Sequence, residues 1–249
     1  MGDGSRKDWY FGGGTLEGAG PLFFLKIPKR AQPGDEALRL IGSFVKKIDY
    51  GGLLGAFDKE CPEPNSEYAP MLAAKQLAQI AGEPVEALYS EEILPGVKRS
   101  FKGLKKFGIE GEATFPGAPV SAGLKLDYKK IKTIDISFGE GSFVRDLRTG
   151  YLKDGLRKIR AHPDDYSSGF FDKDMMIVER ILVARNLEIT VNMKTEFDAG
   201  FDAKLEAENA AHGGLNYSSN KKETVVLSMS DDVPYLFGIS GLRHTKIKV

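Results

Sequence analysis

The residues best suited to chemistry lie in the run Ala-His-Pro-Asp-Asp at 161–165. Histidine and aspartate side chains bind zinc, and a carboxylate that stays off the metal can serve as a general base. His162, Asp164 and Asp165 therefore suggest a zinc hydrolase as one hypothesis. The other two histidines of the sequence are candidates for further ligands: His212 and His244.

The surroundings of this run weaken the zinc hypothesis. The run resembles the core of zinc-dependent N-acetylglucosaminyl deacetylases, where it follows a continuous apolar strand and ends in glutamate. Here it follows the basic stretch LRKIR and ends in Tyr166, which favours a polar loop with a proline turn. Cys61 has no histidine near it, and neither a Gly-x-Ser-x-Gly nor a His-Glu-x-x-His motif occurs. We therefore expect no enzymatic activity, no catalytic residue, and no metal or cofactor.

Composition narrows the remaining classes of protein. The 249 residues include 35 Lys and Arg and 35 Asp and Glu, so the formal net charge is zero. A general nucleic-acid binder needs a basic footprint, and we expect no nucleic-acid partner. A single cysteine points to a reducing compartment. No signal peptide and no apolar run near the roughly 20 residues of a spanning helix is visible, so we expect a cytoplasmic protein before any activation.

The periodicity of the apolar residues predicts one α+β domain over residues 1–249. The glycine-rich residues 1–20 are expected to form a flexible arm. Their glycines loosely suggest a phosphate-binding loop, but Pro21 stands where the helix after such a loop would begin. Residues 21–100 are expected to be mainly helical and residues 101–249 mainly a twisted antiparallel sheet. Helices should therefore pack on the sheet mostly from the N-terminal half.

Individual elements follow from local patterns. Expected helices are 35–45, 71–81, a short one within 85–93, and a basic one over 149–161. Expected strands include 22–27, ended by Pro28, then 176–184, buried on both faces, and 233–240. A further pair of strands is expected within 109–138, around the turn Phe-Pro-Gly-Ala-Pro.

The strongest pattern is an uninterrupted alternation of apolar and polar residues over 187–207. One strand of that length would be unusual, so we expect a hairpin with arms 187–197 and 201–211. A three-residue turn keeps odd positions opposite odd ones, and Asp198, Ala199 and Gly200 suit it. The apolar side chains on the odd positions are Leu187, Ile189, Val191, Met193, Phe197, Phe201, Ala203 and Leu205.

Two interpretations of this hairpin remain open. In one, the sheet is permanently packed in a soluble binding or interaction protein. In the other, the hairpin enters a bilayer, because an 11-residue arm extends about 36 Å and covers about 25 Å when tilted by roughly 45°.

A family resemblance favours the second interpretation. The stretch 176–185 (MIVERILVAR) resembles the gasdermin strand that reads roughly Y-V-V-T-E-V-L, and 235–242 (YLFGISGL) resembles the closing strand of that domain. The resemblance spans about 175–242, and the overall length is similar to that of the compact bacterial gasdermins. It implies a protein that is soluble until activated, with a protease as the candidate activator. It would then assemble into a large homo-oligomeric β-barrel pore in the inner membrane, in cell death against phage.

The sequence departs from that family in two places. Bacterial gasdermins typically carry a lipid-modified cysteine near the amino terminus, whereas Gly2 to Ser5 stand here. They also end in a short inhibitory segment that a protease removes, and only RHTKIKV follows the closing strand. We expect either a different form of restraint or an already shortened chain.

Clusters of basic residues add support for a membrane partner. Each Lys or Arg near an anionic leaflet contributes about 1 kcal/mol. The expected headgroup ligands are Lys98, Arg99, Lys102, Lys105, Lys106, Lys153, Arg157 and Lys158.

Overall fold

The computed structural model describes most of the chain. The described residues are 10–33, 38, 40–49, 60–62, 74–102, 113–114, 125–126, 130–161, 175–197, 200–203, 205–206, 216–221, 223–229 and 233–243. Structural statements below concern these residues.

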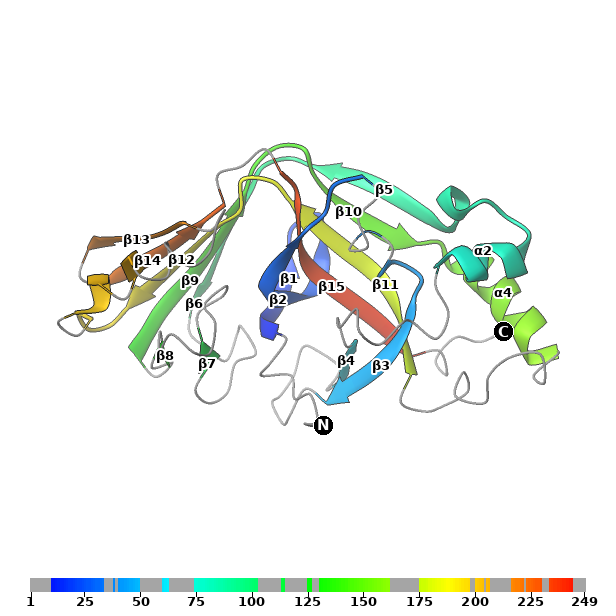
Figure 1. Ribbon diagram of the computed structural model, residues 1–249, viewed down its shortest axis with the longest axis horizontal. Helices are drawn as coiled ribbons and strands as arrows, with labels where there is room; N and C mark the ends of the chain where they lie inside the picture. Colours follow the sequence, from blue (N-terminus) through cyan, green and yellow to red (C-terminus); the bar gives the residue numbers. More distant parts are fainter. Residues whose placement is uncertain are drawn as a thin grey trace.

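Two antiparallel sheets form the body of the molecule and descend from a common crest (Figure 1). The larger, eight-stranded sheet has the order β1-β2-β15-β11-β10-β5, in which β3 also pairs with β11 and β4 pairs with β3. Its strands are β1 (Tyr10–Leu16), β2 (Gly20–Arg30), β3 (Phe44–Asp49), β4 (Glu60–Pro62), β5 (Tyr89–Leu94), β10 (Ser142–Leu147), β11 (Met175–Ala184) and β15 (Tyr235–Arg243). The smaller, five-stranded sheet has the order β13-β14-β12-β9-β6. Its strands are β6 (Val97–Lys102), β9 (Ile131–Phe138), β12 (Glu188–Met193), β13 (Asn216–Lys221) and β14 (Thr224–Ser228).

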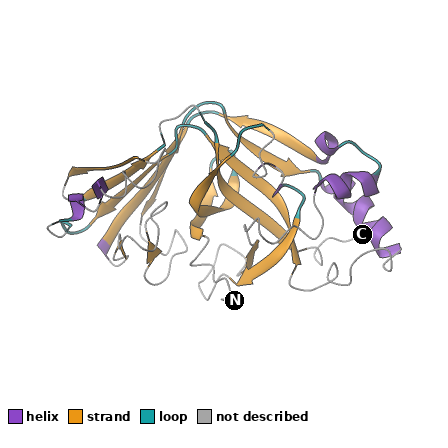
Figure 2. Cartoon of the chain, viewed as in Figure 1, coloured by secondary structure: helices purple, strands orange, loops and turns teal. Residues whose placement is uncertain are grey.

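Three helical elements lie at the far end of the larger sheet, and short helical segments also lie at the outer end of the smaller one (Figure 2). The three elements are α2 (Ala74–Ala81), the 3₁₀ turn η2 (Val85–Leu88) and α4 (Thr149–Ala161). The buried face of α4 consists of Leu152, Leu156 and Ile159, at the spacing of an amphipathic helix. The α+β prediction with a twisted antiparallel sheet is confirmed, as are the described part of helix 71–81 and the whole of helix 149–161.

The core has two parts, one on each face of the larger sheet. The inner core lies between the two sheets, and the outer core lies beneath α2 and α4. Strand β2 contributes to both, because Leu22 and Phe24 belong to the inner core while Phe23 and Leu25 belong to the outer one. β11 is buried on both faces, as its continuous apolar run predicts.

Several expectations for the first hundred residues are wrong. Tyr10 to Leu16, expected within a flexible arm, form β1, and the described residues of 21–100 form more strand than helix. Phe44 and Val45 belong to β3, not to the expected helix 35–45, because they pair with β11. The apolar spacing there is compatible with a helix, but pairing in the sheet overrides such weak local preferences.

Two shorter segments also differ from expectation. Residues 85–93 begin as η2 and continue as β5. β2 runs through Pro28 to Arg30, because its register with β15 shifts between Leu236 and Gly238. An irregularity of this kind leaves the proline without a ladder hydrogen bond to donate.

Candidate functional site

Four pairs of consecutive strands lie on the two sides of the crest, with one strand of each pair in each sheet (Figure 1). They are 89–102 (β5 and β6), 131–147 (β9 and β10), 175–193 (β11 and β12) and, with 230–232 outside the described residues, 224–243 (β14 and β15). We call them the four bent strands. Their lateral order is the same in the two sheets, and every neighbouring pair is antiparallel. The four bent strands therefore form one continuous antiparallel ribbon folded over a crest.

Hydrogen bonds at the crest hold the second and third bent strands together. The Gly139 N–H donates to the Arg185 carbonyl at 2.8 Å. The Ser142 hydroxyl donates to the Gly139 carbonyl at 2.7 Å and accepts the Arg185 N–H at 3.0 Å. Gly141 and Asn186 have φ values of 79° and 50°. Glycine and asparagine tolerate this left-handed backbone better than other residues, which permits the tight bend.

The inner face of the ribbon in the small sheet is apolar and buried. On β12, Ile189, Val191 and Met193 are buried, whereas Glu188 is exposed and Asn192 is partly exposed. The predicted alternation is therefore confirmed over β12. Ile189 lies opposite Ile136 of β9 and Leu227 of β14, so the apolar surface is continuous across three strands.

The opposite face of the same three strands is polar. The Asn192 amide donates to the Thr133 hydroxyl at 2.8 Å and to the Asp135 carboxylate at 3.1 Å. Its oxygen accepts the Thr224 hydroxyl at 3.0 Å. Asn192 thus links β9, β12 and β14 and fixes their register.

The hairpin β1–β2 covers the apolar inner face. The Phe24 ring stacks on Phe237, with centroids 5.0 Å apart, and meets Phe101 edge-on at 6.3 Å. The Arg180 guanidinium pairs with the Asp146 carboxylate and donates to the Ala19 carbonyl at 3.1 Å, at the turn between β1 and β2. The apolar face is therefore shielded from solvent in this conformation.

The prediction of a hairpin over 187–211 is wrong for this conformation. Residues 201–203 and 205–206 are helical, and the two neighbours of β12 are β9 and β14. Because both edges of β12 are already paired, a second arm at 201–211 has no edge to join. In the expected turn, Gly200 has a φ of 94°, and Asp198 and Ala199 lie outside the described residues.

The two phenylalanines beside that turn do share one side, as the alternation predicts. The rings of Phe197 and Phe201 stack with centroids 3.8 Å apart and an interplanar angle of 2°, and both pack against the inner core. Leu187 and Leu205 are buried with the odd positions of β12, whereas Ala203 is exposed. Within 109–138, a pair of two-residue strands, β7 (Ala113–Thr114) and β8 (Lys125–Leu126), precedes β9.

The family of this chain follows from its match to a known family model. A family model described as Bacterial Gasdermin Family matches residues 95–245, from the crest before β6 to the end of β15. The chain belongs to the bacterial gasdermin family. The resemblance seen over 175–242 is thereby confirmed and extended to more than half of the chain, and the protein is a gasdermin-like pore-forming protein. No curated protein matches the sequence significantly.

The expected headgroup ligands of this gasdermin fall into two groups that the fold keeps apart. Lys98 and Arg99 are exposed on β6, in the small sheet. Lys153, Arg157 and Lys158 are exposed on α4, at the far end of the larger sheet (Figure 1). Lys105, Lys106 and the side chain of Lys102 lie outside the description. The structure therefore forms two separate basic surfaces.

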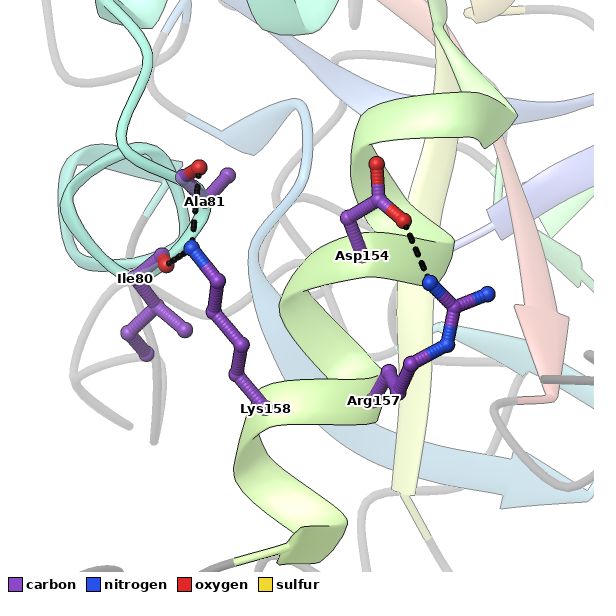
Figure 3. A network of polar contacts seen from close by, with 5 residues as sticks. All are labelled: Ile80, Ala81, Asp154, Arg157 and Lys158. Carbon is purple, nitrogen blue, oxygen red and sulfur yellow. Dashed lines mark hydrogen bonds and ion pairs between the residues drawn. The ribbon is translucent and has the colours of Figure 1, made fainter.

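One of these residues has a role that sequence reasoning missed. The Lys158 ammonium donates to the carbonyls of Ile80 and Ala81 at 2.8 and 3.2 Å, at the C-terminal end of α2 (Figure 3). A cation there satisfies carbonyls that have no partner within the helix. Arg157 pairs with Asp154 one turn away at 3.0 Å. Only the packing of α4 on α2 reveals the contact of Lys158, since 77 and 78 positions separate the partners.

The zinc hypothesis has no described residue to support it. His162, Asp164, Asp165, His212 and His244 lie outside the described residues. Among the residues that the structure describes, no group of three His, Cys, Asp or Glu side chains could hold a metal. Gasdermins are not known as enzymes, and the absence of catalysis stays a prediction for this chain.

None of the described helices is both long enough and apolar enough to cross a bilayer.

Proposed function

We propose that this gasdermin is soluble in the cytoplasm until activated and then assembles into a large homo-oligomeric β-barrel pore. The pore would permeabilise the inner membrane in cell death during antiphage defence, with proteolysis as one possible trigger. The observation that carries the proposal is the ribbon of four bent strands, which pair as two antiparallel hairpins: 89–102 with 131–147, and 175–193 with 224–243.

Straightening at the crest would give strands long enough to span a membrane. A transmembrane strand needs about 9–11 residues, and each bent strand exceeds that length. The apolar inner face of β12 and its neighbours would then meet lipid, and the polar face with Asn192 would line the lumen.

The register between β12 and β14 suggests how the second hairpin lengthens. Val191 lies opposite Val225, and Asn192 lies opposite Thr224. If the two strands extend in this register, Phe201 would face Leu215 and the strands would meet at Glu208. The uninterrupted alternation over 187–207 then belongs to one arm, without a turn at 198–200. This extension requires the helical residues 201–203 and 205–206 to become strand and β13 to leave β14.

Oligomerisation follows from the physics of strand edges. A lone hairpin in hydrocarbon has unpaired backbone groups, and only closure of the sheet into a barrel removes them. Anionic headgroups would bind the basic surfaces on β6 and α4, each of which attracts a negatively charged leaflet.

The test is dye release from anionic liposomes, measured before and after limited proteolysis, with electron microscopy of the same samples. Leakage together with ring-shaped particles supports the proposal. Phe201→Asp should abolish leakage, whereas Asp202→Asn, on the neighbouring polar position, should preserve it. The alternative of a soluble interaction protein draws on the packing of β1–β2 against the inner core. It predicts neither leakage nor rings under any condition, and that result would reject the pore.

A further inference from the structure

Among the residues that the structure describes, the first bent strand is the edge strand of both sheets. Within this part of the chain, β5 pairs with β10 only and β6 pairs with β9 only, so residues 89–102 end both sheets on the same side. The side chains along it are mostly exposed, and Ile93, at 71% exposure, is the large hydrophobic residue most exposed to solvent among those described. An exposed strand edge is a template for pairing with another chain.

The charges on this edge are divided between its two halves. Glu91 and Glu92 lie on β5, and Lys98 and Arg99 lie on β6, with Pro95 and Gly96 between them at the crest. Charges of one sign along an edge would repel a second copy, because like charges directly opposite each other are destabilising. Here acids stand before the crest and bases after it, so an antiparallel second copy would place opposite charges face to face.

We propose that a second copy of this chain pairs with the 89–102 edge about a two-fold axis at the crest, between Pro95 and Gly96. The axis exchanges the two halves of the edge, so β5 of one protomer would lie along β6 of its partner. Glu92 would then lie opposite Arg99 twice, once on each side of the axis. Such an interface is isologous and closed, and it joins the larger sheet of each protomer to the smaller sheet of the other.

The faces of the ribbon agree with this register. Glu92 lies beside Val144 on β10, and Arg99 lies beside Ile136 on β9. Val144 and Ile136 both belong to the inner core, so Glu92 and Arg99 project to the same face of the ribbon. Directly opposite residues of an antiparallel pair must share a face, and this register meets that condition.

The side chains on either side of the Glu92–Arg99 pair are also compatible with this register. Leu94 and Val97, which both contact the inner core, would lie opposite each other next to the axis. Ile93 would lie opposite Lys98, whose aliphatic stem can cover its exposed surface. Glu91 is already paired with Arg145 of its own chain at 2.8 Å, which leaves Glu92 for the partner.

The dimer would have a regulatory consequence if the proposed pore exists. A ring needs the 89–102 edge for the next subunit, and a closed two-fold pair occupies that edge on both protomers. The dimer would therefore be a storage form that separates before assembly. Its existence is tested in solution without membranes, so failure of the pore proposal would leave the dimer intact, and the reverse also holds.

The first experiment measures self-association by sedimentation equilibrium at low ionic strength. Arg99→Glu, which places two carboxylates opposite each other at two sites, should raise the dimer dissociation constant by at least about tenfold. Glu92→Lys should do the same, and the double variant Glu92→Lys with Arg99→Glu should restore association to near the wild-type value. A monomer at all concentrations, or a dimer that neither single variant weakens, would overturn the proposal.

The second experiment locates the axis with a single cysteine. In a Cys61→Ser background, Gly96→Cys should cross-link to its own copy on oxidation or with a short bis-maleimide. A Cβ at Gly96 would approach the Phe138 carbonyl oxygen no closer than 3.5 Å, so the position accepts a side chain. The matched control is Ser218→Cys, exposed on β13 at the opposite edge of the small sheet, which should stay monomeric. Cross-linking of Ser218→Cys but not of Gly96→Cys would overturn the two-fold edge.

Discussion

Lysine substitutions at two adjacent exposed positions should distinguish the lipid-facing side of the proposed pore strand from its lumen-facing side. Thr195 and Glu196 lie shortly after the end of β12 at Met193, and both are exposed. Substitutions at exposed positions outside an interaction network usually change the free energy of unfolding by less than about 0.5 kcal/mol. Thr195→Lys should therefore fold with a stability close to that of the wild type, and urea denaturation of both variants measures any change.

The same two variants should differ in membranes. Thr195 continues the odd positions Ile189, Val191 and Met193, which form the apolar face, whereas Glu196 continues the polar face. A lysine facing the middle of a bilayer costs about 2–4 kcal/mol. Taking about 2 kcal/mol, the insertion equilibrium of each Thr195→Lys subunit falls roughly 30-fold. Glu196→Lys faces the lumen and should have no comparable cost.

Dye release from anionic liposomes, titrated against protein concentration, is the assay. Thr195→Lys should need at least about 30-fold more protein for half-maximal release, whereas Glu196→Lys should remain within a few-fold of wild type. The reasoning is refuted if the two variants release dye equally, whether both are active or both are inactive. Equal leakage would mean that the alternation after Met193 does not continue as a strand with two faces in the membrane.

Three further predictions concern the stability of the folded protein. Gly14→Ala should destabilise it by about 1–3 kcal/mol in urea denaturation, because the new Cβ would lie 2.5 Å from the Phe101 ring; unchanged stability would contradict this contact. Lys158→Ala should cost about 0.5–1 kcal/mol and lower α2 protection in hydrogen exchange, since it caps that helix, whereas Arg157→Ala should leave α2 protection unchanged. Asn192→Ala should cost about 1–3 kcal/mol, because it leaves partly buried hydroxyl and carboxylate partners on two neighbouring strands; a loss below about 0.5 kcal/mol would show that the network is not needed.

The local periodicity of apolar residues was sufficient to predict several elements. The apolar run at 176–184 predicts β11, which is buried on both faces, and the amphipathic pattern predicts α4. The alternation over β12 predicts which of its side chains are buried, because a strand covered on one face imposes a period of two. These features depend on residues that are close in sequence, and the residues themselves contain the signal.

The first hundred residues show where local signals are insufficient. Phe44 and Val45 have helix-compatible spacing and become part of β3, because the exposed edge of β11 offers them backbone partners. The expected second arm at 201–211 fails for the same reason, since β9 and β14 already occupy both edges of β12. Strand pairing is a choice among distant partners, and the sequence of a single strand does not reveal its neighbours.

The sequence by itself determined the two-faced character of the strands, the amphipathic helix α4 and the resemblance to gasdermins. Only the tertiary structure decided that the four bent strands contribute to both sheets and that, among the described residues, the 89–102 edge has no partner strand. It also decided that the basic residues of β6, near the crest, lie apart from those of α4, at the far end of the larger sheet. The physical reason is that side-chain periodicity is a property of each segment, whereas register, edges and the separation of charges arise when distant segments compete for the same backbone hydrogen bonds.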